Sequence, residues 1–365
     1  MNPPLLKSLT LFGITTLYIS FKKSPLSHKL QSITKSIPLT RPLRKENVSI
    51  FSGNANIPLA KEVASHLGLS LSKHISNHFA DGECNVELLD PVRGRDCYII
   101  QPMSTPVNEN LMELIITIGS MKRASAKKIT AVIPYYGYAR ADRKVRSRIP
   151  ISAADVAKML EVMGVNRVMA VDLHCGQIQG FFSPQTMVVN LEAQGMMVDY
   201  LLSKNIVEDL SKLVVVSPDA GGVYRAKTFA EILRRKSGSD PIMAMVTREI
   251  GRPNEVARME LVGDVEGSDC VIVDDIIDTG ATICLTASLL KQHGARKVYA
   301  FATHGLFNKD ALKYIDNSAL DKVIVTNTVL PKGGRISKKI DYISIGSLIA
   351  QAIKRIENNE LIDSF

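Results

Sequence analysis

Residues 271–282 read Val-Ile-Val-Asp-Asp-Ile-Ile-Asp-Thr-Gly-Ala-Thr: an apolar strand, then carboxylates, then a small, hydroxyl-rich turn that opens a helix. Backbone N–H groups in such a turn can bind a phosphate, because the free donors and the dipole of a helix N-terminus favour an anion. Asp274 and Asp275 would repel that phosphate and need hydroxyl donors or a divalent cation instead. We therefore predict a sugar-phosphate site at the carboxyl end of a strand in an α/β sheet. The alternative is an acidic loop that only caps a helix.

Composition and charge exclude several classes of protein. The chain has 365 residues, of which 45% are hydrophobic and 22% are charged, which is typical of a globular protein with about two domains. The formal net charge of +9 suggests a nucleic-acid partner, but Met1–Lys45 carries eight Lys and Arg and no Asp or Glu. The rest of the chain is left with about +1 (9 − 8), so no nucleic-acid partner is predicted. The five cysteines show no C-x-x-C spacing, which argues against a disulfide framework.

The amino-terminal segment 1–47 resembles a targeting peptide more than part of a fold, because it is basic and rich in Ser and Thr. Its apolar run, Leu9–Phe21, is shorter than the roughly 20 residues that a transmembrane helix needs, so no membrane span is predicted. Such a leader is typical of import into an organelle, either the mitochondrion or the plastid. The alternative is a disordered tail on a cytoplasmic protein.

From Val48 onward, short runs rich in Val and Ile alternate with longer amphipathic stretches, which predicts βα units of a parallel sheet. The predicted strands are Val48–Phe51, Cys97–Gln101, Ile129–Ile133, Arg167–Leu173, Leu213–Ser217, Ile242–Val246, Cys270–Val273, Lys297–Thr303 and Lys322–Thr326. The predicted helices include Asn108–Ala124, Ala153–Met163, Gly222–Arg234 and Thr282–His293, with Gly294 ending the last of these.

A weak internal duplication divides the chain into two halves. Cys97-Tyr-Ile-Ile and Cys270-Val-Ile-Val each precede a predicted helix and a further strand in the same layout. We therefore predict a domain over residues 48–192 and a second over residues 193–365, whose last helix can pack back on the first. Only the second copy has the paired aspartates, so the first is free to bind another ligand.

Two further segments follow predicted strands and carry polar side chains. Asp172–Phe182 reads Asp-Leu-His-Cys-Gly-Gln-Ile-Gln-Gly-Phe-Phe and is too polar for a core, so His174 is a candidate metal ligand. Ser217–Gly222 places Asp219 as a candidate magnesium carboxylate before a helix. The alternatives are a structural histidine and a helix cap.

Aromatic and basic residues alternate in Tyr135–Arg148, which reads Tyr-Tyr-Gly-Tyr-Ala-Arg-Ala-Asp-Arg-Lys-Val-Arg-Ser-Arg. Aromatic faces beside guanidinium groups suit a purine base together with a polyphosphate. Nucleic acid is the competing ligand, but a second basic patch is missing from the sequence. Phe79–Glu83 (Phe-Ala-Asp-Gly-Glu) places another aromatic beside carboxylates and is a weak signal by itself.

Taken together, these segments resemble the ribose-phosphate pyrophosphokinases, or phosphoribosyl pyrophosphate synthetases, from about Val48 to the carboxyl terminus. Asp172–Phe182 is similar to the family signature, and Val271–Thr282 to the phosphoribosyl-binding motif shared with phosphoribosyltransferases. The resemblance implies an α/β fold of two tandem phosphoribosyltransferase-type domains with parallel sheets flanked by helices. It also implies transfer of the diphosphoryl group of ATP to ribose 5-phosphate, Mg²⁺ as cofactor, and dimers that build a hexamer or a hetero-oligomer with paralogues.

The resemblance implies a role for each matching position. Ribose 5-phosphate would be bound by Asp274, Asp275, Asp278, Thr279, Gly280, Ala281 and Thr282. ATP would be bound by Arg140, Asp142 and Arg143 and, from a neighbouring subunit, by Phe79, Asp81 and Glu83. His174 and Asp219 would hold the metal, and the catalytic cations would be Arg248 and Arg252.

Three departures from the family pattern stand out. Ala141 occupies a position where Gln is usual, and Ser183–Asn190 is longer than usual and lacks an Asp before Asn190. The largest departure lies in Thr247–Asn254, where Arg248 and Ile250 replace the usual Lys-x-Arg, so that one of two cations is missing unless Arg252 substitutes for it. The sequence therefore leaves open a weakly active or non-catalytic regulatory subunit of a synthetase assembly. A phosphoribosyltransferase is the third alternative, but it gives no account of Asp172–Phe182.

Overall fold

A computed structural model describes residues 45–249, 258–331 and 337–362 of the chain. All of these residues belong to one compact unit. The predicted leader, apart from its last three residues, lies outside the described residues.

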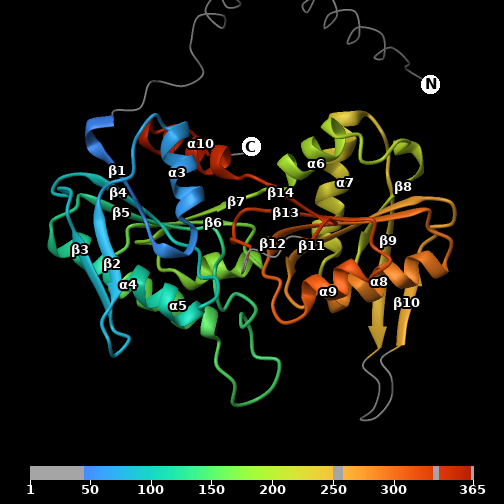
Figure 1. Cartoon of the computed structure of the whole chain (residues 1–365), viewed down its shortest axis with the longest axis horizontal. Coiled ribbons are helices and arrows are strands. Elements are labelled where there is room, and N and C mark those ends of the chain that lie inside the picture. Colours follow the sequence, from blue (N-terminus) through green and yellow to red (C-terminus); the bar gives the residue numbers. More distant parts are fainter. Residues whose placement is uncertain (1–44, 250–257, 332–336, 363–365) are drawn as a thin grey trace, which may run out of the picture. The chain divides into compact units, whose positions relative to one another are not determined.

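The first half of this unit is built on a five-stranded sheet in which all strands are parallel, in the order β1-β4-β5-β6-β7. Its strands are β1 (Val48–Ser52), β4 (Asp96–Ile100), β5 (Lys128–Ile133), β6 (Arg167–Val171) and β7 (Met187–Leu191). Its helices are α3 (Ile57–His66), α4 (Val107–Arg123) and α5 (Ser152–Val162). Helices cover both faces of the sheet, with α4 and α5 on one and α3 on the other (Figure 1). β1 and β4 are therefore buried along their whole length, as parallel strands between helices are.

The second half is built on a seven-stranded sheet in the order β10-β9-β8-β11-β12-β13-β14, in which only β10 runs antiparallel to its neighbour. Its strands are β8 (Leu213–Ser217), β9 (Ile242–Glu249), β10 (Arg258–Val262), β11 (Asp269–Ile277), β12 (Lys297–Gly305), β13 (Lys322–Thr326) and β14 (Ile340–Ile343). Its helices are α6 (Gln194–Ser203), α7 (Val223–Ser237), α8 (Ala281–Gln292), α9 (Ala311–Asp316) and α10 (Gly346–Glu357). α6 and α7 cover one face of this sheet, and α8 and α9 cover the other (Figure 1).

Smaller elements complete the described chain. β2 (His74–His78) and β3 (Cys84–Leu88) form an antiparallel hairpin separate from both sheets. The short 3₁₀ helices are η1 (Lys45–Asn47), η2 (Asn54–Asn56), η3 (Gly176–Phe181) and η4 (Leu210–Lys212).

The last helix, α10, contacts the first half of the unit although it follows the second sheet in sequence. The Tyr98 hydroxyl on β4 donates a hydrogen bond of 2.6 Å to Glu357 at the end of α10. At the other end of the helix, Ser344 donates a hydrogen bond to Glu62 on α3. The two sheets lie on either side of the predicted boundary at residues 192 and 193, and that boundary stays a prediction.

The predicted fold class is confirmed, and each of the nine predicted strands lies on an observed one. Five strands within the described ranges were not predicted, namely β2, β3, β7, β10 and β14. These five strands form the separate hairpin or lie at the edge of a sheet. Few of their side chains are fully buried, so their apolar pattern is weak. β2, for example, has no buried residue. One prediction is corrected in detail: β11 continues through Asp274 and Asp275 to Ile277 rather than ending before them. No helix in the described part of the chain is long and apolar enough to cross a membrane.

Polar contacts join the two halves beneath the carboxyl ends of their strands. Asp172 follows β6 with a positive φ of 40°, a conformation that Asp tolerates better than most residues. Its Oδ2 accepts a hydrogen bond of 2.5 Å from Thr303 Oγ1 on β12. The next residue, His304, is 2% exposed, with Nδ1 3.0 Å from Thr328 Oγ1 and Nε2 3.3 Å from the Asp172 carbonyl oxygen. These contacts fix the loop after β6 against the second sheet.

The buried His304 gives a testable pH dependence of stability. Burial lowers its pKa to about 4, whereas the unfolded chain takes up the proton near its ordinary value of 6.5. The contribution of His304 to the free energy of unfolding is therefore complete above pH 6.5 and declines by up to about 3 kcal/mol as the pH falls toward 4. His304→Gln should lack this pH-dependent part of the free energy of unfolding. Urea unfolding of both proteins between pH 7 and 4 would measure the difference. Free energies of unfolding that change with pH by the same amount in both proteins would contradict the prediction.

Candidate active site

The site is built around the carboxyl end of β11, where Asp274 and Asp275 lie side by side near the centre of the second sheet. Asp275 is 4% exposed, and the Asp274 side chain is only partly accessible. The Asp275 backbone N–H donates a hydrogen bond of 2.9 Å to Asp274 Oδ1, which fixes the first carboxylate against the strand. Two adjacent, mostly buried carboxylates require positive partners, because desolvation and mutual repulsion both oppose their ionisation.

Arg225 in the first turn of α7 supplies one such partner to both aspartates. Its Nη1 lies 3.4 Å from Asp274 Oδ1, and its Nη2 lies 3.3 Å from Asp275 Oδ1. His174 supplies the other, with Nδ1 2.6 Å from Asp275 Oδ2. Asp275 thus has a cationic or hydrogen-bonding partner on each oxygen.

In this environment the pKa values of the two carboxylates shift in opposite directions. Burial raises the pKa of Asp274, and the negative charge of Asp275 raises it further. Burial also acts to raise the pKa of Asp275, but the hydrogen bond from His174 and the charge of Arg225 outweigh it and hold that pKa below its ordinary value. The hydrogen bond to Asp275 in turn raises the pKa of His174. Asp275 is therefore the member of the pair that stays ionised.

A cavity of about 550 Å³ opens over these residues. Its lining brings together residues from both halves of the chain: Arg140, Asp142, Arg143, His174, Cys175, Gln177, Asp219, Gly221, Gly222, Arg225, Asp274, Asp275 and Ile276. The predicted metal residues, three of the predicted ATP residues and two of the three predicted ribose carboxylates therefore share one cavity.

The two predicted metal ligands have free donor atoms in this cavity. Asp219 Oδ1 accepts a hydrogen bond of 2.8 Å from the Gly222 N–H, while Oδ2 has no partner among the described residues. His174 uses Nδ1 for Asp275 and leaves Nε2 without a partner in the same part of the chain. No group of three or more His, Cys, Asp or Glu in the described residues is arranged to hold a metal by itself. One carboxylate fits Mg²⁺ whose other ligands are water and phosphate, which is its usual coordination, while the imidazole is a nitrogen ligand that Mg²⁺ takes less often.

Ion pairs and hydrogen bonds also connect the predicted ATP side to the predicted ribose side. Arg140 Nη1 lies 2.9 Å from Asp278 Oδ2, and Asn308 donates a hydrogen bond of 2.6 Å to Asp278 Oδ1. Asp142 Oδ2 accepts hydrogen bonds from the Cys175 thiol, at 2.9 Å, and from the Gln177 amide, at 3.0 Å. The Arg140 pair joins the Tyr135–Arg148 segment to the residues after β11, and the Asp142 contacts join it to the loop after β6.

The predicted phosphate turn opens α8. Gly280 is the N-cap residue, with a φ of 76°, and no side chain caps this helix end. Thr279, Gly280, Ala281 and Thr282 are not among the lining residues of the cavity, although they follow its Ile276 by a few residues. A helix N-terminus without a side-chain cap leaves backbone N–H groups free for an anion.

Other predicted residues lie elsewhere or outside the description. Phe79 is 55% exposed in the turn between β2 and β3, where the Phe79 N–H donates to the Glu83 carbonyl and the Glu83 N–H to Asp81 Oδ1. None of these three residues lines the cavity. The side chain of Arg248 and the whole of Arg252 lie outside the described residues, as does Ile250.

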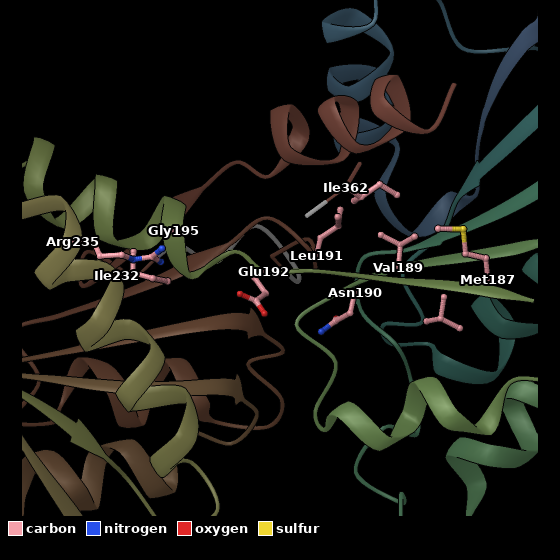
Figure 2. A pocket seen from close by; sticks show the side chains of 10 residues that line it. Met187, Val189, Asn190, Leu191, Glu192, Gly195, Ile232, Arg235 and Ile362 are labelled. Atoms are coloured by element: carbon pink, nitrogen blue, oxygen red, sulfur yellow. The ribbon is translucent and has the colours of Figure 1, made fainter. Parts of the chain in front are cut away.

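A separate hollow of about 480 Å³ runs along β7, the edge strand of the first sheet, and shares no lining residue with the cavity (Figure 2). Val189 and Leu191 point to the side of the strand where Ile362 lies, and Asn190 points to the other side (Figure 2). Asn190 Oδ1 accepts a hydrogen bond of 3.0 Å from the Leu173 N–H. The stretch that departs from the family pattern thus forms an edge strand that supports the His174 loop.

The chain has two sheets of mostly parallel strands, with a carboxylate pair near the end of one strand and an uncapped helix end after it. These features define an α/β protein of the phosphoribosyltransferase type. Residues 48–164 match the family described as "N-terminal domain of ribose phosphate pyrophosphokinase", and residues 239–365 match "Phosphoribosyl synthetase-associated domain". The chain belongs to the ribose-phosphate pyrophosphokinase family.

Relatives of known name agree with this assignment. The ribose-phosphate pyrophosphokinase of Vibrio cholerae is 46% identical over 320 residues, which cover 87% of this chain and 98% of that protein. The enzyme of the same name from Shewanella oneidensis is 44% identical over 321 residues, covering 87% and 98%. The crystal structure of phosphoribosylpyrophosphate synthetase from Mycobacterium smegmatis has a TM-score of 0.78 at 37% identity, covering 86% of this chain and 99% of that one.

The sequence reasoning missed Arg225, which contacts both aspartates. One signal could have indicated it: an arginine in the first turn of the helix that follows the Asp219 loop, close to a strand end that carries two carboxylates. The partner itself could not be deduced, because Arg225 and Asp275 are 50 positions apart and meet only through the pairing of β8 with β11.

Cys175, which lines the cavity, allows a test of how burial and Asp142 affect a pKa in this site. Burial raises the pKa of Cys175 to about 12, and the hydrogen bond to Asp142 acts in the same direction. The thiol should therefore be alkylated slowly by iodoacetamide at pH 8, and Asp142→Asn should speed the reaction by roughly tenfold for each unit by which the pKa falls. Peptide mass spectrometry would measure the modification, with Cys84 as the internal reference. Equal rates at Cys175 in both proteins would contradict the assignment.

Proposed function

We propose that this chain makes 5-phosphoribosyl 1-diphosphate and AMP, by transferring the diphosphoryl group of ATP to the anomeric hydroxyl of ribose 5-phosphate. Its family membership supports this reaction. The observation that carries the proposal is the single cavity in which the β11 carboxylates meet His174 and Asp219. Phosphoryl transfer of this kind depends mainly on positioning and charge stabilisation, which such an arrangement can supply.

On the ribose side, Asp274 and Asp275 would accept hydrogen bonds from the sugar hydroxyls, because carboxylates are acceptors only. The turn at the start of α8, with Thr279, Gly280, Ala281 and Thr282, would hold the 5-phosphate through backbone N–H groups and hydroxyls. Asp278 would stay paired with Arg140 and tie this turn to the ATP side.

On the ATP side, Arg140, Asp142 and Arg143 would contact the nucleotide, because they line the same cavity as the carboxylate pair. Phe79, Asp81 and Glu83 would act on the adenine of a neighbouring subunit, which agrees with the exposed position of Phe79 at a hairpin turn. That role requires an oligomer, either dimers that build a hexamer or a hetero-oligomer with paralogues.

The proposed cofactor is Mg²⁺, held through His174 Nε2 and an Asp219 carboxylate oxygen. When bound with ATP, this ion would neutralise phosphate charge. The chain's own residues would orient the two substrates, exclude water and balance the negative charge. Arg248 and, as a partial substitute for a missing second cation, Arg252 would stabilise the group in transfer.

A second candidate function is a weakly active or non-catalytic regulatory subunit of a synthetase assembly. It is favoured by one observation, that Ile250 stands where the family pattern has an arginine. The proposed location is a mitochondrion or plastid, based on the basic leader, which has no Asp or Glu before Glu46, and a reporter fused to residues 1–47 would test it.

The reaction itself can be tested on the wild type and two variants. We expect purified protein with Mg²⁺, ATP and ribose 5-phosphate to release AMP slowly, because loss of one stabilising charge costs roughly 10²–10³ in rate. Ile250→Arg should raise turnover and Arg252→Ala should lower it, as followed by chromatography of AMP and ADP. Absence of AMP from both the wild type and Ile250→Arg would favour the regulatory subunit.

The role of the phosphate turn can be tested with two matched glycines. Gly280 and Gly294, at opposite ends of α8, have φ values of 76° and 85°. Substitution of either by Ala should therefore cost a similar amount of stability, about 1–2 kcal/mol. Only Gly280→Ala should weaken ribose 5-phosphate, by roughly tenfold, because only there do displaced N–H groups face the phosphate. Titration calorimetry and thermal unfolding would measure both effects, and an equal loss of sugar affinity in both variants would contradict the assignment.

A further inference from the structure

Arg225 pairs at once with both carboxylates at the end of β11, and one of these carboxylates also pairs with His174. We propose that Arg225 is a positioning residue: it holds Asp274 and Asp275 in the arrangement that receives ribose 5-phosphate and, through Asp275, sets the ring of His174. The inference rests on the proposed function and extends it to a residue on α7.

Arg225 contacts the two aspartates with the two terminal nitrogens of its planar guanidinium group. Separate nitrogens of Arg225 approach separate aspartates, at 3.4 and 3.3 Å. The side chain is 19% exposed, against 18% for Asp274 and 5% for Asp275, so solvent screens these pairs only weakly. In the described part of the chain, no other Lys or Arg forms an ion pair with either aspartate.

The start of α7 places this side chain. Gly222, the N-cap residue, packs closely against Ser217, because a Cβ there would lie only 2.8 Å from Ser217 Oγ. The Arg225 carbonyl accepts a hydrogen bond of 3.3 Å from the buried Gln194, which ties the first turn of α7 to α6. The guanidinium therefore extends from a fixed backbone position.

The same contact reaches the proposed metal site through Asp275. Arg225 holds one oxygen of this carboxylate, and the other accepts the hydrogen bond from His174 Nδ1. A proton on Nδ1 leaves Nε2 as the free lone pair, and a carboxylate partner of this kind fixes both the tautomer and the ring orientation of a ligating histidine. The chain Arg225–Asp275–His174 thus links the sugar carboxylates to the nucleotide side.

Two substitutions of Arg225 test this role in the full-length protein. Arg225→Met removes the charge and keeps most of the apolar stem, while Arg225→Lys keeps the charge but lacks the planar fork whose separate nitrogens reach separate carboxylates. Arg235→Met is the matched control, because it removes one arginine from the exposed face of the same helix. The measurements are calorimetric affinities for ribose 5-phosphate without nucleotide and for Mg-ATP without sugar. Nitrogen NMR of histidine-labelled protein would report the His174 ring, with its signal assigned by His174→Gln.

We expect Arg225→Met to weaken ribose 5-phosphate by roughly tenfold or more, since charge-assisted contacts of the carboxylates are lost. It should also weaken Mg-ATP and alter the Nδ1–H signal of His174. Arg225→Lys should show smaller changes in the same direction, and Arg235→Met should resemble the wild type in all three measurements.

Wild-type sugar affinity together with an unchanged His174 signal in Arg225→Met would overturn the proposal. If Arg225→Met does not fold, the same result in Arg225→Lys would overturn it. Failure of the proposed function has a different signature, because it would appear as wild-type protein that neither binds ribose 5-phosphate nor releases AMP. The comparison of the His174 signal between variants and wild type would still test Arg225 in that case.

Discussion

Two neighbouring carboxylates in a mostly buried position are the constraint on which the rest of the site depends. Asp274 and Asp275 follow one another on β11, where burial and mutual repulsion both oppose ionisation. Arg225 and His174 offset this cost, and they come from a helix of the second half and from a loop of the first half. At the carboxylate pair, β11 therefore contacts two distant segments of the chain, α7 and the loop after β6.

The scaffold keeps those segments in place with contacts that have no direct part in the proposed chemistry. Thr303 and His304 on β12 hold Asp172, two residues before His174, so the His174 loop is anchored to the second sheet. α10 returns to the first half through Glu357 and Tyr98. The two sheets are thus joined both beneath the site and at the far end of the chain, which is consistent with one compact unit.

The departures from the family pattern do not include the carboxylate pair. Ala141 and the strand β7 border residues that line or support the cavity, and Ile250 belongs to the stretch Thr247–Asn254, which would carry the catalytic cations. The residues that bind sugar in the proposed reaction keep the family types. We therefore expect this chain to bind its substrates as other members of the family do. We expect it to differ from them in the rate of catalysis and in the regulation of that rate.

The amino-acid sequence was enough to predict the fold class, nine of the strands and the paired aspartates before a helix, because alternating apolar and amphipathic periods and a Thr-Gly-Ala-Thr turn are local signals. It also indicated His174 and Asp219 one by one, since each follows a predicted strand. It did not indicate the outer strands such as β2 and β14, whose side chains are largely exposed or partly buried and whose periodicity is weak. Only the tertiary structure decided that Arg225 bridges both aspartates, that Asp275 bonds His174, and that β11 continues through the pair. The contacts of Arg225 and His174 join residues 49 to 101 positions apart, and they are set by sheet order and side-chain direction, which no local pattern records.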